Sequence, residues 1–578
     1  MNHTAKEERA GLEHGPEPVD PVTRAATATF GIRYLFPWQR LVIANILDAA
    51  APQAESPDMD RLSDEGARDE DHAARGRQIV LLPTGAGKSL CFQVPALFLA
   101  KPTLVVFPLL ALMGDQSRRM AEAGLEPVIF RGAQSKEERE ECFRRIEGTD
   151  GKPPAKLIIA NPEVLAGNAI LDRIAARGVS HLAIDEAHCV SEWGDTFRPA
   201  YLDLARVIER LDPPAVTGFT ATASPEVLAR TAEVLFGGNA HIVRGESDRP
   251  NISYTVRRCH AKDAALVREV ALRKRPLVIF CATRGGTERA AALLRETLRD
   301  EEIRFYHAGL LKEEKIAVEA WFHRHEGGIL TATCAWGLGI DKKNVRTVIH
   351  RDPPPTAEAY IQEAGRGGRD GETAEAVLLW GARDRKRISR LPDFDRRRAE
   401  VLVRFAESGQ CRREILLLAL GDVRAGKDAP EGERIACSGC DVCAGLAQTE
   451  EEDGRVVLGY IEKNRRCHQR EMIADILCEA GNRVTREKRG YQVWKRADFM
   501  GIMEELESEG RIRELGYWPW KGTMTTVRPP LLPLLRKNAY RHAEIRSRPF
   551  RPILPRRARE VDGVSLPEEG ACDIARCN

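Results

Sequence analysis

A glycine-rich segment in the first quarter of the chain has the composition of a phosphate-binding loop. LPTGAGKS (82–89) follows an apolar run and precedes a helical pattern, although the strict loop pattern has a glycine where Leu82 stands. In such a loop, backbone N–H groups surround phosphate oxygens, Lys88 neutralises the β- and γ-phosphates, and the Ser89 hydroxyl coordinates magnesium. A strand–turn–helix without nucleotide is the alternative for this stretch alone. We predict that ATP and Mg²⁺ are held here by Thr84, Gly85, Gly87, Lys88 and Ser89.

A pair of carboxylates ends another apolar run further along the chain. HLAIDEAH (181–188) places Asp185 and Glu186 at the carboxyl end of an expected strand, where α/β sheets bind ligands. Asp185 is suited to hold magnesium through water, and Glu186 to orient or deprotonate the attacking water. A lone Asp-Glu pair usually belongs to an ordinary loop. Together with the phosphate loop upstream, however, this pair predicts a site that hydrolyses ATP.

Two arginines form a third motif with phosphate-binding chemistry. QEAGRGGRDG (362–371) carries Arg366 and Arg369 in a glycine-rich turn, which lets both guanidinium groups approach a phosphate without steric hindrance. An arginine that reaches across a domain cleft stabilises transition-state charge and couples hydrolysis to closure of the cleft. A surface loop with two solvated arginines is the alternative. We predict that Arg366 and Arg369 are catalytic.

Strands and helices must position these motifs, and the hydrophobic pattern predicts two sets of them. Short β-branched runs, typical of buried parallel strands, alternate with helical patterns. The first series lies at 78–82, 103–107, 157–160 and 181–185, and the second at 277–281, 328–333, 347–350 and 376–380. Two such series predict an α/β protein with two parallel-sheet domains in tandem. A turn-rich segment at 244–251 has the composition of a linker between them.

Length and composition restrict the class of protein. At 578 residues the chain is too long for one hydrophobic core, so about three to five domains are expected. No apolar run is long enough to cross a membrane, and the amino terminus lacks the apolar segment of a signal peptide. Thiols such as Cys91, Cys281 and Cys334 stand alone in apolar runs, which favours a reducing compartment. We expect a cytoplasmic protein without a membrane partner, associated with the nucleoid if the organism is bacterial.

The net charge of +2 gives no hint of a nucleic-acid partner, so the local distribution of charge matters. Residues 51–75 hold eight carboxylates against three arginines and almost no large apolar side chains, which predicts a flexible insertion. A regulatory role for this insertion is the alternative. Residues 1–25 are polar and are predicted to be disordered. The stretch from Arg536 to Arg559, in contrast, has nine Lys or Arg and forms a local basic patch.

One group of cysteines has the spacing of metal ligands. Cys411 opens a helical stretch, and Cys437, Cys440 and Cys443 follow as CSGCDVC. Two-residue gaps let neighbouring thiolates converge on one tetrahedral ion, and the fourth ligand comes from a distant helix. Four thiolates bind either zinc or an iron–sulfur cluster, so the residues alone leave both open. Because four protein ligands leave no open position, the site is predicted to be structural.

The three phosphate-site motifs resemble motifs I, II and VI of superfamily-2 helicases. Further stretches extend the resemblance: FTATAS (219–224) resembles motif III, TATCAWGLGIDKKNV (331–345) resembles motif V, and YHAGL (306–310) resembles another family element. Two stretches narrow it to the RecQ family: AHCVSEWGDTFRPAY (187–201), similar to that family's aromatic-rich loop, and DRPNISY (248–254), similar to its interdomain stretch. The resemblance covers residues 26–445 strongly and 450–530 weakly. It implies RecA-like motor domains and an ATP-dependent DNA helicase that moves 3′ to 5′.

The resemblance also implies roles for single residues around the nucleotide. FGIRYLFPWQ (30–39) resembles the adenine-recognising motif, whose Gln39 would bond the base edge. The family usually has an arginine where Phe36 stands and an aromatic residue near Ile32, and Arg33 is a candidate substitute. Gly337 and Asp341, in the stretch that resembles motif V, are expected at the nucleotide. The cysteine set is expected to hold Zn²⁺, although the gap before Cys437 is long.

Aromatic residues are the expected contacts with DNA. In the aromatic-rich loop, Trp193 and Phe197 would stack on bases and Arg198 would bind the strand, so that DNA could shift Glu186 and switch on hydrolysis. Two aromatic residues of the core are the alternative. After the cysteines, three amphipathic helical stretches and a predicted hairpin are similar to a winged-helix domain. Trp518 and Trp520 would stack on an opened base pair at the hairpin tip, with core packing as the alternative.

These inferences divide the chain into six segments. They are a disordered tail (1–25), motor domain 1 (26–245), motor domain 2 (246–385), a helical zinc-binding domain (386–448), a divergent winged-helix domain (449–530) and a basic tail (531–578). The expected partner is DNA, both single-stranded and forked. A translocase that remodels nucleic acid without unwinding, an RNA-directed helicase and a DNA-binding scaffold with a decayed motor are the alternatives. The intact Lys88, Asp185, Glu186 and Arg369 argue against the scaffold.

Overall fold

The computed structural model describes most of the chain. The described residues are 20–51, 76–83, 87–108, 110–149, 151–192, 199–245, 248–336, 342–426, 429, 434–448 and 451–527. Most of the acidic insertion at 51–75 and the basic tail lie outside them. No helix among the described residues is both long and apolar enough to cross a membrane.

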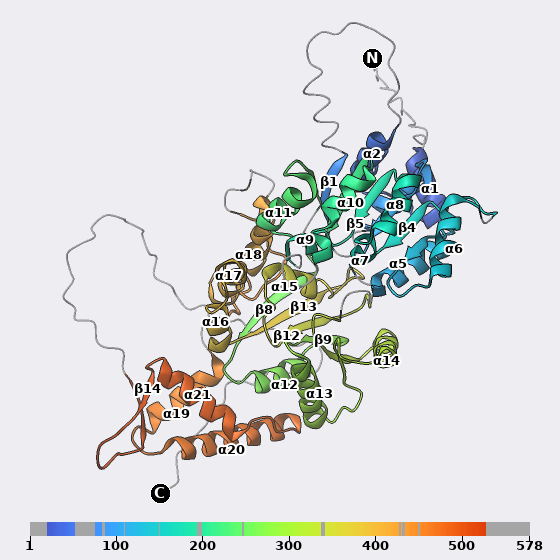
Figure 1. Cartoon of the computed structure of the whole chain (residues 1–578). Coiled ribbons are helices and arrows are strands. Elements are labelled where there is room, and N and C mark those ends of the chain that lie inside the picture. Colours follow the sequence, from blue (N-terminus) through green and yellow to red (C-terminus); the bar gives the residue numbers. More distant parts are fainter. Residues whose placement is uncertain are drawn as a thin grey trace, which may run out of the picture. The chain divides into compact units, whose positions relative to one another are not determined.

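The first part of the chain folds around a parallel sheet of seven strands in the order β3-β4-β2-β5-β6-β1-β7 (Figure 1). The strands are β1 (Arg77–Leu81), β2 (Thr103–Val106), β3 (Val128–Phe130), β4 (Leu157–Ala160), β5 (His181–Ile184), β6 (Ala215–Thr220) and β7 (His241–Arg244). The strands β2, β4, β5 and β6 are buried along their whole length because helices cover both faces. Their carboxyl ends therefore lie at one edge, where the predicted ATP motifs follow β1 and β5.

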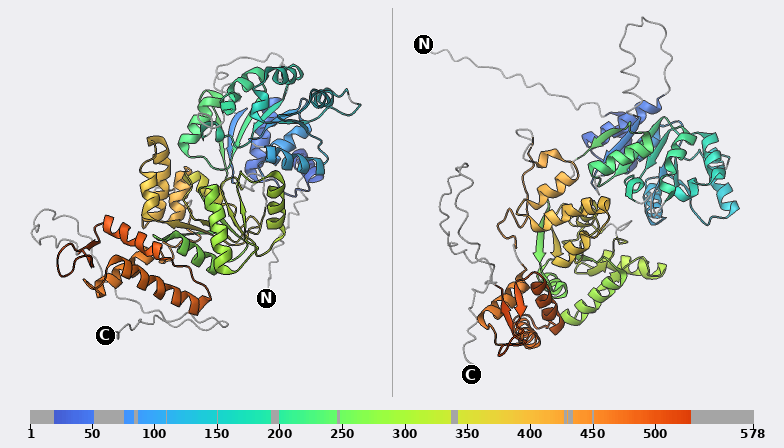
Figure 2. Two further views of the ribbon diagram at one scale, coloured as in Figure 1. Left: turned by 60° about the horizontal axis from the view of Figure 1, so that its bottom comes forward. Right: turned by 60° about the vertical axis from the view of Figure 1, so that its left-hand side comes forward.

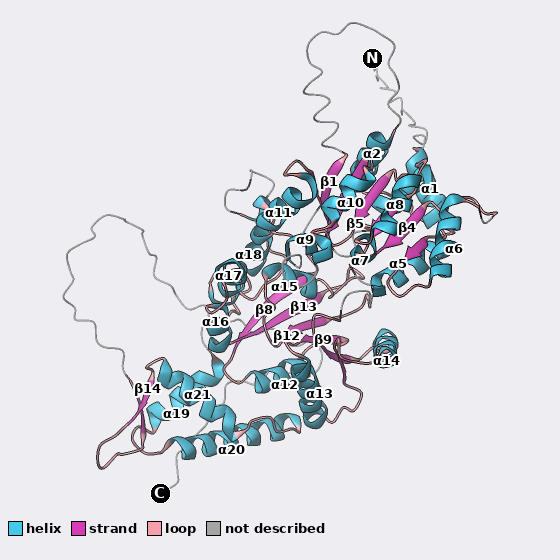
Figure 3. Ribbon diagram, in the orientation of Figure 1, coloured by secondary structure: helices cyan, strands magenta, loops and turns pink. Residues whose placement is uncertain are grey.

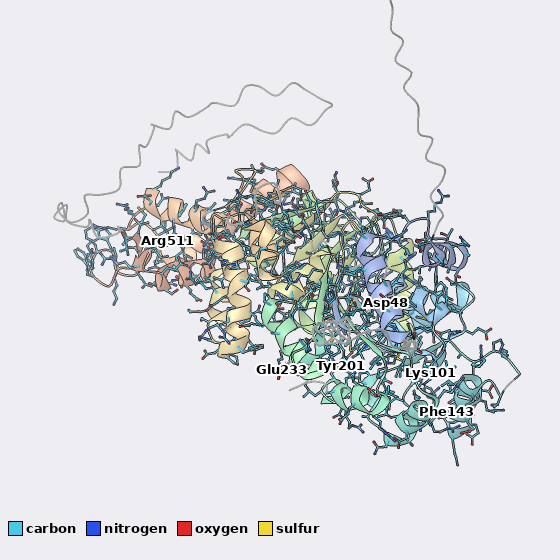
Figure 4. All side chains as sticks on the ribbon, turned by 90° about the horizontal axis from the view of Figure 1, so that it is seen from above. Asp48, Lys101, Phe143, Tyr201, Glu233 and Arg511 are labelled. Atoms are coloured by element: carbon cyan, nitrogen blue, oxygen red, sulfur yellow. The ribbon has the colours of Figure 1, made fainter. Side chains whose placement is uncertain are left out.

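Helices connect these strands in the alternating order expected of an α/β domain. They are α1 (Pro21–Phe30), α2 (Pro37–Ala50), α4 (Leu90–Phe98), α5 (Leu110–Glu122), α6 (Lys136–Glu147), α7 (Pro162–Leu165), α8 (Asn168–Arg177), α9 (Cys189–Glu192), α10 (Leu204–Leu211) and α11 (Pro225–Phe236). Local signals set several ends. Ser135 and Glu138 form a capping box at the start of α6, and Ser224 caps α11, which ends at the left-handed Gly237. Side chains fill the space between sheet and helices, and Tyr201, labelled in Figure 4, is fully buried.

A second parallel sheet of six strands follows, in the order β10-β11-β9-β12-β13-β8 (Figure 3). Its strands are β8 (Ile252–Arg258), β9 (Leu277–Phe280), β10 (Arg304–Tyr306), β11 (Ile329–Ala332), β12 (Thr347–His350) and β13 (Ala374–Trp380). The helices are α12 (Lys262–Leu272), α13 (Arg284–Leu298), α14 (Lys312–Arg324), α15 (Ala357–Ala364) and α16 (Ala382–Ile388). Two parallel sheets in tandem, each with helices on its faces, confirm the predicted RecA-like pair of domains.

The region of the cysteine cluster packs on the edge strand β8. It consists of α17 (Asp393–Glu407), α18 (Arg412–Ala419), a short 3-10 turn (Val423–Ala425) and the cysteine loop. The buried side chains of Tyr254, Tyr360 and Phe405 form one apolar cluster with Ile415 and Cys440. The N–H of Asp441 donates to the carbonyl of Tyr254, which continues the sheet edge into the loop.

Three helices and a hairpin follow: α19 (Glu452–Lys463), α20 (Arg470–Arg489), α21 (Arg496–Ser508), β14 (Ile512–Glu514) and β15 (Met524–Thr526). All three helices and the hairpin were predicted. Their apolar faces join the core of the second sheet domain, where Val457, Phe499 and Ile502 share one cluster with Leu266 and Val267 of α12. Both views in Figure 2 show these orange and red helices against the green helices of that domain. The carboxyl-terminal region therefore shares a core with the second motor domain.

Several boundaries differ from the prediction. Helix α1 begins at Pro21, inside the segment predicted to be disordered, because Asp20 caps it and Pro21 suits a first helical position. Helix α16 crosses the boundary predicted at 385. Among the isolated thiols, Cys91 and Cys281 are buried, and Cys334, two residues after the end of β11, is exposed.

Candidate functional site

The phosphate loop lies between the end of β1 and the start of α4, as predicted. Gly87 has φ +80°, a left-handed conformation that favours glycine, and a Cβ atom there would displace the amide of Gln39, whose Nε2 would lie 2.8 Å away. Nε2 of Gln39 donates to the carbonyl of Gly87 at 3.4 Å, and its Oε1 accepts from the N–H of Phe36 at 2.9 Å. These contacts bring the predicted adenine-recognising residue to the loop. Thr84 and Gly85 lie outside the described residues.

Lys88 and the carboxylates after β5 meet at the carboxyl edge of the first sheet. Nζ of Lys88 lies 3.8 Å from Oε1 of Glu186, and both side chains are nearly buried. Nζ of Lys88 has no hydrogen bond within the described part of the chain. A buried ammonium group without hydrogen bonds is suited to receive an anionic oxygen ligand. The contact brings together the two motifs that were predicted separately.

The side chain of Ser89 is also placed at this edge. Its hydroxyl donates to Oε1 of Gln116 on α5 at 3.2 Å. The sequence analysis did not identify Gln116, since a glutamine inside an amphipathic helix carries no signal of a site. Gln116 orients the hydroxyl that was predicted to bind magnesium.

The electrostatics of the site give its two carboxylates different properties. Burial and the neighbouring charge of Glu186 raise the pKa of Asp185 to about 6. Burial also acts to raise the pKa of Glu186, but the charges of Lys88, His188 and Arg366 outweigh it and lower that pKa. Glu186 therefore stays ionised at neutral pH, as a group that orients or activates water must.

His188 connects the carboxylates to the stretch that resembles motif III. Its Nδ1 lies 2.9 Å from the hydroxyl of Thr220, at the end of β6, and 3.3 Å from Oε2 of Glu186. Thr220 in turn donates to the carbonyl of Thr222 at 3.2 Å. A movement of the 219–224 stretch would therefore be transmitted to Glu186 through the imidazole ring of His188.

The arginine loop of the second domain (residues 365–369) carries a charge that acts on the Glu186 carboxylate. Arg366 is buried at the end of α15, and its guanidinium carbon lies 5.7 Å from the centre of the Trp336 ring. Burial and the like charge of Arg369 lower the pKa of Arg366 to about 9, while Glu363 and Glu186 act in the opposite direction. The charges of Arg366 and Glu186 thus influence each other although the two residues belong to different sheets. Sequence analysis had not singled out Trp336.

The four predicted metal ligands converge on one point. The sulfur atoms of Cys411, Cys437, Cys440 and Cys443 all lie within 4.8 Å of one another. The Cys411 and Cys440 sulfurs are 3.9 Å apart, close to the separation of about 3.8 Å between two thiolates on one tetrahedral zinc ion. The donor set and its spacing therefore fit a single tetrahedral ion.

Comparison with known proteins places the chain in a family. The DEAD/DEAH box helicase profile matches residues 70–231, and the helicase conserved C-terminal domain profile matches residues 261–371. The chain is 35% identical over 390 residues to the ATP-dependent DNA helicase RecQ of Haemophilus influenzae, covering 65% of this chain and 60% of that protein. It is 30% identical over 429 residues to the ATP-dependent DNA helicase RecQ of Bacillus subtilis, covering 72% of this chain and 70% of that protein. The chain belongs to the RecQ family.

The alignment leaves part of the Haemophilus relative unmatched, because the chain spans about 60% of that protein's length. Among solved structures, the crystal structure of DUF1998 helicase MrfA bound to DNA is similar with a TM-score of 0.50 and 17% sequence identity. That similarity covers 89% of this chain and 63% of that chain, and it supports the fold alone.

Most of the predicted DNA contacts of this RecQ-family chain lie outside the described residues. These are the aromatic-rich loop residues Trp193, Phe197 and Arg198. The predicted nucleotide contacts Gly337 and Asp341 also lie outside. Their roles stay predictions.

The hairpin tip presents the remaining predicted aromatic contacts. Between β14 and β15, Trp518 is 87% exposed, so the alternative of core packing is wrong for this residue. Trp520 is half-buried, and the guanidinium carbon of Arg466 lies 4.7 Å from the centre of its ring. Tyr517 meets Trp520 edge to face at 5.9 Å. A large apolar ring held this far out of the core is suited to contact a partner.

Proposed function

We propose that this chain is an ATP-driven DNA helicase that moves 3′ to 5′ on single-stranded DNA and opens duplexes in repair or recombination. One observation carries the proposal: Lys88 pairs with Glu186 in the first sheet domain, and the charge of Arg366 from the second acts on the pKa of the same carboxylate. A cation at the loop, an ionised carboxylate and an arginine from a second domain are the parts that phosphoryl transfer requires.

The residues of the site divide the work of hydrolysis. Lys88 would bind the β- and γ-phosphates, and Glu186 would orient the attacking water and accept its proton. Arg366 and Arg369 would stabilise negative charge on the γ-phosphate as it is transferred. Gln39 would bond the adenine edge. Since the arginines belong to a different domain from Lys88, hydrolysis would require the two domains to close.

Two further groups of residues would hold metal ions. Ser89 and Asp185 fit a magnesium ion bound with ATP, which would neutralise phosphate charge. Cys411, Cys437, Cys440 and Cys443 would hold one zinc ion. The close spacing of their sulfurs supports a single ion over an iron–sulfur cluster, because several irons spread their ligands further apart. With four protein ligands the zinc would support the fold.

The DNA would contact the aromatic residues. Trp193, Phe197 and Arg198 would bind the single strand next to Glu186 and make hydrolysis depend on DNA. Trp518, exposed at the hairpin tip, would stack on the opened base pair, with Trp520 behind it. The order α19, α20, α21 and hairpin, with a bridge between Gln469 and Thr523, supports a divergent winged-helix domain for residues 449–530.

Strand separation on a panel of substrates tests this proposal. The purified chain, ATP and Mg²⁺ are mixed with a forked DNA duplex, a bubble, a branched junction and an RNA duplex of matched sequence. We expect the DNA fork to be opened and the RNA duplex to stay paired, with no opening by the Lys88→Ala variant. Opening of RNA alone would favour an RNA-directed helicase. ATP hydrolysis stimulated by DNA without any strand separation would favour a translocase.

A further inference from the structure

The interdomain linker makes a set of contacts with the arginine loop of residues 365–369. The guanidinium group of Arg249 donates from Nη1 to the carbonyl of Gly365 at 3.2 Å. Its Nη2 donates to the carbonyls of Gly367 at 3.1 Å and Gly368 at 2.9 Å. One planar side chain thus binds three backbone carbonyls on both sides of Arg366.

A second linker residue restricts the other end of the loop. Nδ2 of Asn251 donates to the carbonyls of Gly368 and Glu372, each at 2.8 Å. Gly368 has φ +57°, and a Cβ atom there would lie 2.4 Å from the carbonyl oxygen of Glu372. The backbone therefore approaches the linker as closely as glycine allows, and its path from Gly365 to Glu372 is fixed.

These contacts supply bonds that the loop cannot make by itself. The loop follows the end of α15, where the last carbonyls of a helix lack partners within the helix. Hydrogen bonds from a charged donor are stronger than neutral ones and have a defined direction. Short glycine-rich turns otherwise have many accessible conformations. The linker therefore helps to fix the conformation in which Arg366 and Arg369 are presented, together with the N–H of Gly368, which donates to the carbonyl of Val345 at 2.9 Å.

The linker is itself held from its other side by α18. The guanidinium group of Arg413 bonds the Asp248 carboxylate, the Arg249 carbonyl at 3.0 Å and the carbonyl of Ile252. The side chain of Arg413 is 2% exposed, so these bonds lie away from solvent. The backbone of Arg249 is therefore held in place by Arg413. A continuous set of hydrogen bonds runs from α18 in the cysteine-bearing region, through the linker, to the arginine loop.

We propose that Arg249 is a positioning residue for hydrolysis: it acts through Arg366 and Arg369 by holding the backbone between them. This inference rests on the proposed function of the arginine loop. Arg249 does not need to touch ATP. Its loss should allow the two arginines to move by an ångström or more, and a misplacement of that size lowers a catalytic rate by roughly 30-fold to 100-fold.

Steady-state hydrolysis with single-stranded DNA tests the proposal on Arg249→Ala and Arg249→Lys in the full chain. We expect kcat to fall roughly 30-fold to 100-fold in Arg249→Ala, with KM for ATP within about twofold of wild type. Arg249→Lys should recover little, because an ammonium group does not span three carbonyls. In an Arg366→Ala/Arg369→Ala background, which lacks both arginines that Arg249 positions, Arg249→Ala should lower kcat by less than about threefold.

Arg244→Ala is the matched control. This guanidinium group also donates to carbonyls near a helix end, those of Leu420 at 3.3 Å and Gly421 at 3.1 Å, but within the described part of the chain these bonds do not reach the arginine loop. Its kcat should stay within about threefold of wild type. Losses that multiply in the Arg249/Arg366/Arg369 triple variant, or a rise in KM with kcat unchanged, would overturn the proposal. If the wild type itself does not hydrolyse ATP, the proposed function fails instead.

Discussion

The ion pair between Arg412 and Asp441 should determine whether the cysteine cluster holds its shape. Nε of Arg412 lies 3.0 Å from Oδ1 of Asp441, and both side chains are only 2% exposed. Asp441 stands next to Cys440, and its other oxygen accepts the N–H of Val256 on β8 at 2.9 Å. The carboxylate therefore joins three parts of the molecule: α18, the cysteine loop and the second sheet.

Replacing Asp441 with Ala leaves a buried guanidinium group without its counter-charge. Loss of one partner of a buried pair costs about 3–5 kcal/mol, and Val256 also loses an acceptor. Arg412 keeps the carbonyls of Phe405 and Ser408, so we expect a loss of about 4 kcal/mol in the free energy of unfolding of this region. With a urea dependence of about 2 kcal/mol per molar, the unfolding midpoint should fall by about 2 M.

Release of the proposed zinc ion to a coloured chelator, followed against urea concentration, measures this midpoint. Asp393→Ala is the control, because Asp393 pairs with Arg396 at the surface and is 84% exposed, where such pairs contribute less than about 1 kcal/mol. The double variant Arg412→Met/Asp441→Leu should regain most of the stability, since it buries no unpaired charge. A midpoint for Asp441→Ala that matches Asp393→Ala would refute the reasoning.

Three further predictions concern the carboxyl-terminal region and the DNA contacts. Burial acts to lower the pKa of His260, but its hydrogen bond to Glu505 and the charges of Asp453, Glu505 and Glu451 raise it. A raised folded-state pKa stabilises the protein below the unfolded value of about 6.5 and loses this effect as pH rises through the folded pKa. Melting curves of His260→Gln should therefore show a larger loss at pH 6 than at pH 8.5; equal losses would contradict this. Trp518→Ala should keep DNA-stimulated ATP hydrolysis but slow fork opening at least about fivefold, since base stacking contributes about 1–3 kcal/mol, and unchanged opening would exclude the hairpin. Trp193→Ala should keep DNA-free hydrolysis and flatten its stimulation by DNA; a lower melting temperature with loss of every activity would make Trp193 a core residue.

Much of the fold could be predicted from hydrophobic runs, and the exceptions have physical reasons. All eight predicted strands are present, because each run is mostly apolar and almost entirely buried. The strands at 128–130 and 304–306 are too short to show a period, and the one at 215–220 contains Thr and Gly in place of a β-branched apolar run. The edge strand at 252–258 alternates buried and half-exposed residues, so it lacks the continuous apolar pattern.

Site residues in a motif that follows a strand could be predicted from the sequence. Contacts that depend on which strands are neighbours in the sheet could not. Asp185 and Glu186 follow β5 directly, and Lys88 lies in the loop after β1, so the motif and the strand together place them. The contact between His188 and Thr220 depends on β5 and β6 being neighbours in the sheet, which no local pattern records. The bonds from Arg249 to the arginine loop likewise require that β8 and β13 pair. The DRPN stretch was noticed as a family feature, but its contacts emerge only in three dimensions.

The participation of the second domain in ATP hydrolysis is the central claim, and the turnover of Arg369→Ala tests it most directly. The measurement compares kcat for ATP with saturating single-stranded DNA in wild type and variant, with nucleotide affinity determined separately on both proteins. We predict that kcat falls by about three orders of magnitude while nucleotide affinity changes little, because this arginine would act on the transition state. Turnover near the wild-type value would show that Arg369 does not reach the phosphates and would contradict the account.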